Sequence, residues 1–156
     1  MAAEIQIYGV IASREVLEGL ADAAVTDGVD YIDDLDRDGV LRKISQASAA
    51  GVAVCFEGAG STIFENVVAF CEDNSLSYRR EADADDEFSA EIVTFDAATG
   101  TKEEFERGHR QRTVVGLDVL AGITDMTELT SLIERMRAIE ADIGPIVVPA
   151  APAPAA

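Results

Sequence analysis

Two hydrophobic periods alternate along the chain, and each predicts a different kind of element. Alternating apolar residues predict a strand over 4–11, and apolar residues at helical spacing predict a helix between Ser13 and Gly28. Ser13 suits an N-cap, and Gly28 provides the left-handed turn at which helices often end. The apolar stripe of this helix consists of Val16, Leu17, Leu20, Ala21 and Ala24. A short apolar piece over 29–32 predicts another strand.

The middle of the chain repeats this alternation. Residues 40–50 predict a second helix, ended by a glycine, and the continuous apolar run 52–56 predicts a central strand that is buried on both faces. A loop over 58–61 lacks both nucleotide-binding fingerprints. Thr62 and Glu65 then have capping-box spacing. They predict a third helix with a wide apolar face, formed by Ile63, Phe64, Val67, Val68, Phe70 and Cys71.

The later part predicts a hairpin and a long final helix. Residues 76–80 and 90–95 predict paired strands, 101–107 a short helix, and 113–115 a further strand. The final helix is predicted over 125–143, with one narrow apolar stripe that we expect to face the core: Met126, Leu129, Ile133, Met136, Ile139 and Ile143. Because the stripe is as narrow as a coiled-coil seam, a homodimer through this helix is the alternative.

These elements together predict the α+β (mixed α/β) class, with a mixed sheet and helices packed on it. We expect a single domain over 1–144 and a flexible Pro/Ala-rich tail over 145–156. A hydrophobic content of 48% is enough for a packed core. No apolar run reaches the roughly 20 residues that cross a bilayer, and no signal peptide is recognisable. We therefore expect a cytoplasmic protein without a membrane partner.

The charge narrows the choice of partners. Thirty acidic residues oppose twelve basic ones, and the net charge of -18 would repel both nucleic acid and anionic membranes. Cations, basic protein surfaces, or solubility in a salt-adapted organism remain as explanations of the acidity.

No catalytic or zinc-binding pattern accompanies this charge. Cys55, Cys71 and the single histidine, His109, match no zinc spacing, and the cysteines lie on apolar segments typical of a core. His109 belongs to the basic cluster 107–112 and has no nucleophile in a suitable context beside it. We interpret the cluster as a solvated loop or as the partner of an acidic segment. The sequence thus indicates a protein that is not an enzyme and needs no cofactor.

The first acidic segment supports two interpretations. Residues 34–39 match the D-x-D-x-D-G opening of a calcium loop, in which Asp34, Asp36 and Asp38 would be the metal ligands. Position twelve of such a loop should be a bidentate Glu, and here it is Ser45. Calcium binding would therefore be weak. In the other interpretation Asp36 or Asp38 simply caps the following helix.

The second acidic segment, 81–87, carries five acids in seven residues and is predicted to project from the hairpin. Such a surface can imitate the phosphates of nucleic acid and occupy basic clefts. We therefore predict a non-catalytic binding or inhibitor protein whose partner is a basic, nucleic-acid-binding protein. The residues expected to contact it are, first, Asp83, Asp85, Asp86 and Glu87 and, second, Asp33, Asp34, Asp36 and Asp38.

Two stretches also carry a family resemblance. Residues 64–78 end in a late-helix Cys followed by Leu-x-Tyr, and an acidic gap separates them from the strand-like residues 89–95. The combination resembles small acidic proteins of unassigned function that are encoded on bacterial plasmids and phages. The resemblance implies an accessory protein of a mobile element, a setting in which counter-defence factors and regulatory inhibitors are common. It carries over no site residue.

Overall fold

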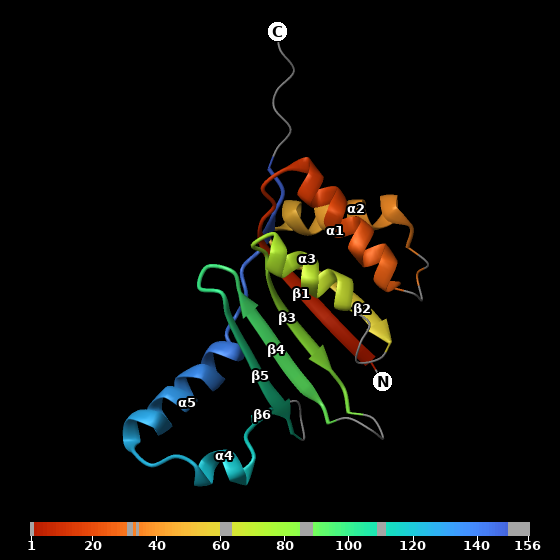
Figure 1. Ribbon diagram of the computed structural model, residues 1–156. Coiled ribbons are helices and arrows are strands. Elements are labelled where there is room, and N and C mark those ends of the chain that lie inside the picture. Colours follow the sequence, from red (N-terminus) through yellow and green to blue (C-terminus); the bar gives the residue numbers. More distant parts are fainter. Residues whose placement is uncertain are drawn as a thin grey trace.

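Six strands of the described residues form an antiparallel sheet, and a seventh, short strand is added to it in parallel. The computed structural model describes residues 2–30, 33, 35–59, 64–84, 89–108 and 112–149. The strands are β1 (Ala2–Val10), β2 (Val54–Ala59), β3 (Ser77–Ala82), β4 (Glu91–Asp96), β5 (Thr101–Arg107), β6 (Thr113–Val114) and β7 (Ile146–Val147). Their order is β2-β1-β3-β4-β5-β6, and β7 pairs in parallel with β1 (Figure 1). The predicted α+β class is confirmed.

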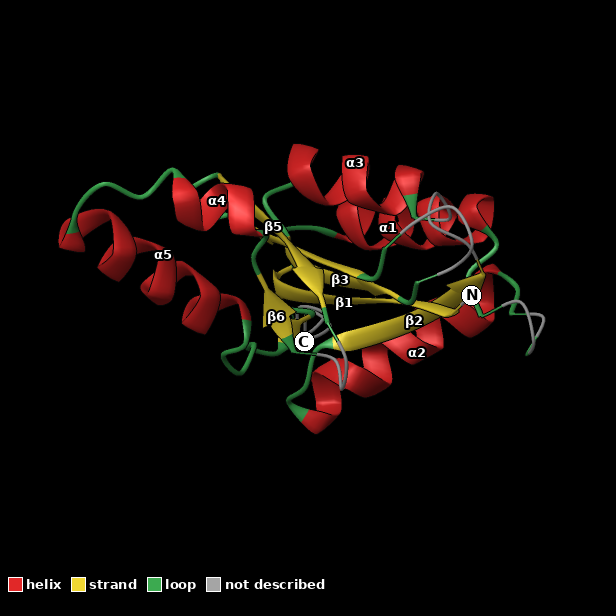
Figure 2. Ribbon diagram, turned by 90° about the horizontal axis from the view of Figure 1, so that it is seen from below, coloured by secondary structure: helices red, strands yellow, loops and turns green. Residues whose placement is uncertain are grey.

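Helices pack on both faces of this sheet. They are α1 (Arg14–Asp27), α2 (Arg37–Ala50), α3 (Glu65–Asp73), α4 (Leu117–Ala121) and α5 (Met126–Ile139). Figure 2 shows α1 and α3 together on one side of the sheet, away from α5. We call the two sides the α1/α3 face and the α5 face. Helix α2 contacts α1, the edge strand β2 and β7.

The α1/α3 face carries the main core. Alternate residues of β1 point to it, and cross-strand register places Phe56 opposite Ile5 and Tyr78 opposite Ile7. All four side chains are fully buried. Leu20 and other apolar residues of the helices pack against them and complete this core. A second, smaller cluster lies on the α5 face and consists of Ile92, Phe105, Leu132 and Ile139.

Several predicted helix ends are confirmed, because they depend on local geometry. Ser13 caps α1 by accepting a hydrogen bond from the amide of Val16 (3.2 Å). Gly28 and Gly51 end α1 and α2 in the left-handed conformation, with φ of 65° and 70°. The hairpin of β3 and β4 also forms as predicted.

Other predictions are wrong. The run 52–56 was expected to be central, yet β2 is an edge strand that pairs only with β1 among the described strands. The half-buried Cys55 lies on the outer face of β2. Because cysteine is apolar, the run resembled a strand that is buried on both faces. Residues 29–30 form a turn rather than a strand, and the rest of that predicted strand, 31–32, lies outside the described residues.

The predicted short helix over 101–107 is instead strand β5. Gly100, with φ of 68°, completes a turn that folds the segment back onto β4 in antiparallel register. Phe105 is buried while its neighbours Glu104 and Glu106 are exposed, which is the period of a strand. The glutamates of this segment favour a helix intrinsically, and strand pairing overrides that preference.

The final helix is shorter than predicted, and its stripe faces the core only in part. Helix α5 ends at Ile139, with Asp125 as its N-cap. Leu132 and Ile139 are buried, whereas Met126 is 72% exposed and Ile133 is 40% exposed. The homodimer through 125–143 stays a prediction.

The chain also stays in the fold beyond residue 144. Ile146 is fully buried and belongs to β7, and the amide of Gly9 donates a hydrogen bond to the carbonyl of Pro145 (3.0 Å). The predicted tail therefore cannot begin at residue 145. Residues 150–156 lie outside the described part of the chain.

Candidate functional site

The first acidic segment begins helix α2. Asp36 is its N-cap, and the carboxylate accepts a hydrogen bond from the amide of Gly39 (2.8 Å). Asp38 follows in the first turn and is exposed, and its negative charge interacts favourably with the helix dipole. Asp33 is exposed in the preceding turn, and Asp34 lies outside the described residues. The helix-capping interpretation is confirmed for Asp36.

Calcium binding by this segment stays a prediction. Within the described part of the chain, no group of three or more His, Cys, Asp or Glu side chains could hold a metal ion. Asp34, the first ligand of the proposed loop, falls outside that part. Asp36 already uses one carboxylate oxygen in its cap.

The second acidic segment divides between structure and surface. Glu81 lies in β3, where Arg107 binds its carboxylate at 2.8 Å, so the prediction that the segment 81–87 projects from the hairpin is wrong for Glu81. Asp83 is exposed, and its amide donates a hydrogen bond to the carbonyl of Ala2 (2.9 Å). Asp85, Asp86 and Glu87 lie outside the described residues.

Strand β5 adds acids to the same end of the sheet. Register places Glu106 opposite Glu91, and Glu104 opposite Val93, on the α1/α3 face. Both glutamates of β5 are exposed, because α1 and α3 cover the inner strands and leave this strand open. Like charges that lie directly opposite each other destabilise a sheet. We call Glu91, Glu104 and Glu106 the acidic strand face.

Nearby cations do not neutralise this face fully. Arg80 pairs with Glu91 (2.6 Å), and Lys102 pairs with Glu72 of α3 (2.8 Å). Glu104 and Glu106 have no ion pair with the rest of the described chain. Eight of the eleven cationic side chains that the structure describes are held by the protein's own acids. The surplus of negative charge is therefore left at the surface.

Glu72 fastens the end of α3 to the sheet beside this face. It accepts hydrogen bonds from Lys102 (2.8 Å) and from the hydroxyl of Tyr78 (2.7 Å). These two bonds, that of Lys102 first, hold the pKa of Glu72 below its ordinary value. Burial and the neighbouring Glu72 carboxylate raise the pKa of Tyr78.

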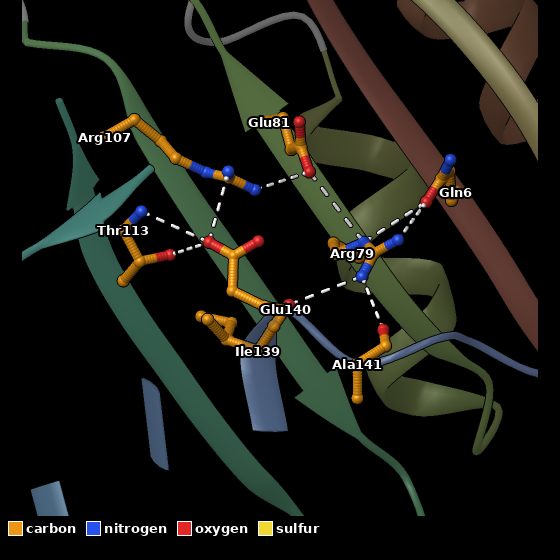
Figure 3. Close-up of polar contacts among 8 residues, drawn as sticks. All are labelled: Gln6, Arg79, Glu81, Arg107, Thr113, Ile139, Glu140 and Ala141. Carbon is orange, nitrogen blue, oxygen red and sulfur yellow. Dashed lines mark hydrogen bonds and ion pairs between the residues drawn. The ribbon is translucent and has the colours of Figure 1, made fainter. Parts of the chain in front are cut away.

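A polar network holds α5 on the opposite face (Figure 3). Arg79 donates to the side-chain oxygen of Gln6 (3.1 Å) and to the carbonyl of Ala141 (2.8 Å), just past the helix end. Arg107 lies between Glu81 (2.8 Å) and Glu140 (3.3 Å). The pairing predicted between the basic cluster and an acidic segment is thus present at Arg107. The cluster's His109, Arg110 and Gln111 lie outside the described residues.

Sequence reasoning missed one buried charge, Asp30. It is only 4% exposed, accepts a hydrogen bond from the amide of Glu57 (2.7 Å) and pairs with Lys43. Its φ is 50°, a left-handed conformation that Asp tolerates better than most residues. An Asp two residues after the helix-ending glycine was the only local signal. The pair ties the turn after α1 to both α2 and β2.

The prediction that the cysteines lie in the core is confirmed for Cys71 and only in part for Cys55. Cys71 is buried and Cys55 half-buried, and both are free. Burial raises the pKa of each thiol to about 12. Both remain protonated at neutral pH, and neither is an activated nucleophile.

Among the described residues, no helix has both the length and the apolar character needed to span a membrane. Comparison of the chain with protein-family models, with curated proteins and with solved structures finds no match.

Proposed function

We propose that this chain is a non-catalytic binding protein that inhibits or regulates a basic, nucleic-acid-binding protein through its acidic surface. One observation carries the proposal. Glu104 and Glu106 stand exposed on one strand, without a cation from the described chain, and Glu106 lies directly opposite Glu91. A basic partner would relieve the repulsion that this arrangement creates.

The proposed contact surface combines β5 with the adjoining acidic segment. Asp83, Asp85, Asp86 and Glu87 follow β3 in sequence, and Ala82 at the end of β3 is paired with Glu91. Asp83, the residue that follows Ala82, therefore lies next to the acidic strand face. The first acidic segment, with Asp33, Asp34, Asp36 and Asp38, is a second contact region in this proposal.

The electrostatic field favours such a partner. A surface of high negative charge accelerates association with a basic cleft, and the same field repels nucleic acid itself. The protein would then compete with nucleic acid for the cleft. The resemblance to acidic proteins of plasmids and phages supports a role in counter-defence or in regulation of a mobile element.

A capture experiment in the native host's extract tests this function. Immobilised protein is incubated with extract at near-physiological salt and again at about 1 M salt, where the Debye length falls to about 3 Å. A basic partner should bind at the lower salt and be lost at the higher one. Added DNA or RNA should displace it. Capture that is insensitive to both salt and nucleic acid contradicts the proposal.

A further inference from the structure

A cavity of about 410 Å³ opens on the α5 face, on the other side of the sheet from the acidic strand face. Its size falls within the roughly 300–1,000 Å³ typical of small-molecule sites. Strands β1, β3, β4 and β5 form its floor, and the end of α5 with residues 141–144 forms its wall. Nothing in the proposed function uses this cavity.

Strand register explains why polar groups converge there. Arg79, Thr94 and Glu103 lie side by side on three neighbouring strands, because Thr94 is paired with both of the others. Two residues further along β4, Asp96 is paired with Thr101 of β5. Tyr8 of β1 lines the same cavity. Side chains two residues apart on a strand share a face, so both rows face α5.

The two cations of the cavity are already occupied. Arg135 of α5 binds the Glu103 carboxylate in bidentate fashion, with Nη2 at 2.7 Å from Oε2 and Nε at 3.0 Å from Oε1. Arg79 donates to Gln6 and to the carbonyls of Ile139 (3.3 Å) and Ala141 (2.8 Å). Neither guanidinium is free to receive an anion.

The groups that remain available are carboxylates, an aromatic ring and threonine hydroxyls. The carboxylate of Asp96 accepts one hydrogen bond, from the amide of Ala98 (2.9 Å), and Asp142 in the wall is exposed. Tyr8 offers an aromatic ring, and burial, followed by the charge of Asp96, raises the pKa of its hydroxyl. The hydroxyl therefore stays neutral.

We propose that this cavity binds a small organic cation with a primary ammonium group on an aliphatic chain. Asp96 receives the ammonium group, and Asp142 strengthens the local negative field. The Tyr8 ring packs against the chain or the cation, and the hydroxyls of Thr94 and Thr101 accept further N–H groups. The negative charge of the whole protein raises the local concentration of such cations.

Calorimetric titration at low ionic strength with putrescine and spermidine tests the proposal. Butanediol and succinate, which share the four-carbon chain but carry no positive charge, should give no binding. Asp96→Asn should weaken putrescine binding by about tenfold, since a charged hydrogen bond is replaced by a neutral one. The variant retains an oxygen that can accept from Ala98, so its fold should persist. The thermal unfolding of the Asp96→Asn variant is measured in parallel to check its fold.

Asp118→Asn is the matched control, because it removes one exposed carboxylate from α4, which does not line the cavity. It should change the affinity less than about twofold. NMR shifts of the Thr94 and Thr101 amides should accompany binding to the wild-type protein. The proposal is overturned if neither putrescine nor spermidine binds at a concentration of about 10 mM, because a Kd above this value means very weak affinity. It is equally overturned if Asp118→Asn weakens binding as much as Asp96→Asn.

Discussion

Glu91 and Glu106 are direct cross-strand partners on β4 and β5, so two carboxylates of like charge face each other at the open end of the sheet. Arg80 pairs with Glu91, whereas Glu106 has no ion pair with the described chain. A fold selected for stability alone gains nothing from this arrangement. A surface that binds a basic partner does gain from it, because cationic side chains of the partner would lie beside the two carboxylates.

Glu106→Lys should therefore stabilise the isolated protein. The substitution turns a repulsive cross-strand pair into an attractive one, and such pairs contribute about 0.2–1 kcal/mol. The free energy of unfolding in urea measures the change. A loss of stability in this variant would show that Glu106 is not under repulsion.

Asp27→Ala should destabilise the fold by about 0.5–2 kcal/mol, the usual range for a lost helix cap. Asp27 ends α1, yet its carboxylate accepts hydrogen bonds from the amides of Asn66 (3.2 Å) and Val67 (2.8 Å) at the start of α3. Helix α3 has no capping side chain of its own. Urea unfolding provides the measurement. Asp38→Ala is the control, because Asp38 makes no cap bond and the substitution should remove only its weaker interaction with the helix dipole. Equal effects of the two substitutions would contradict the role of Asp27.

Local and non-local features explain how far the sequence could predict this structure. The caps at Ser13 and Asp36 were predictable because each depends on residues within one turn. The predicted capping box at Glu65 is wrong, since α3 begins there and its amides are capped by Asp27, from another helix. Thr62, the other member of that box, lies outside the described residues.

The candidate site was predictable only in part for the same reason. The acids of 81–87 are visible in the sequence, but the contribution of β5 depends on its strand register. Helix propensity pointed to the wrong element there, and the exposed positions of Glu104 and Glu106 follow only once β5 pairs with β4. Burial of Asp30 likewise requires Lys43, thirteen residues later, and the amide of Glu57.

Lys43→Met should cost more stability than Asp30→Asn. Removing the cation leaves the buried Asp30 carboxylate with only the Glu57 amide to stabilise it. Loss of one member of a buried pair costs about 3–5 kcal/mol, and we expect about 2 kcal/mol here because Lys43 is partly exposed. Asp30→Asn keeps an acceptor for the Glu57 amide, and the remaining Lys43 can be hydrated. Urea unfolding of both variants decides the order, and the reverse order would contradict it.

Acidification should weaken the contact between α3 and the sheet through Glu72. Its pKa is lowered in the folded state by Lys102 and Tyr78, so the unfolded chain takes up the proton first as pH falls. The stabilisation is complete above the ordinary pKa of 4.5 and disappears as pH falls through the lower, folded value. Thermal unfolding from pH 7 to pH 3 should show a smaller acid-dependent loss in Glu72→Gln than in the wild type. Identical pH profiles would exclude this role.

The affinity of charge-reversal variants for the captured partner tests the central claim most directly. The double variant Glu104→Lys/Glu106→Lys reverses two of the three charges of the acidic strand face. The control Asp118→Lys/Glu134→Lys makes the same change in net charge at exposed positions on α4 and α5. A titration at near-physiological salt should show at least about a hundredfold loss for the first variant and less than about fivefold for the second. Equal affinities of the two variants, whether both are weakened or both unchanged, would contradict binding through this face.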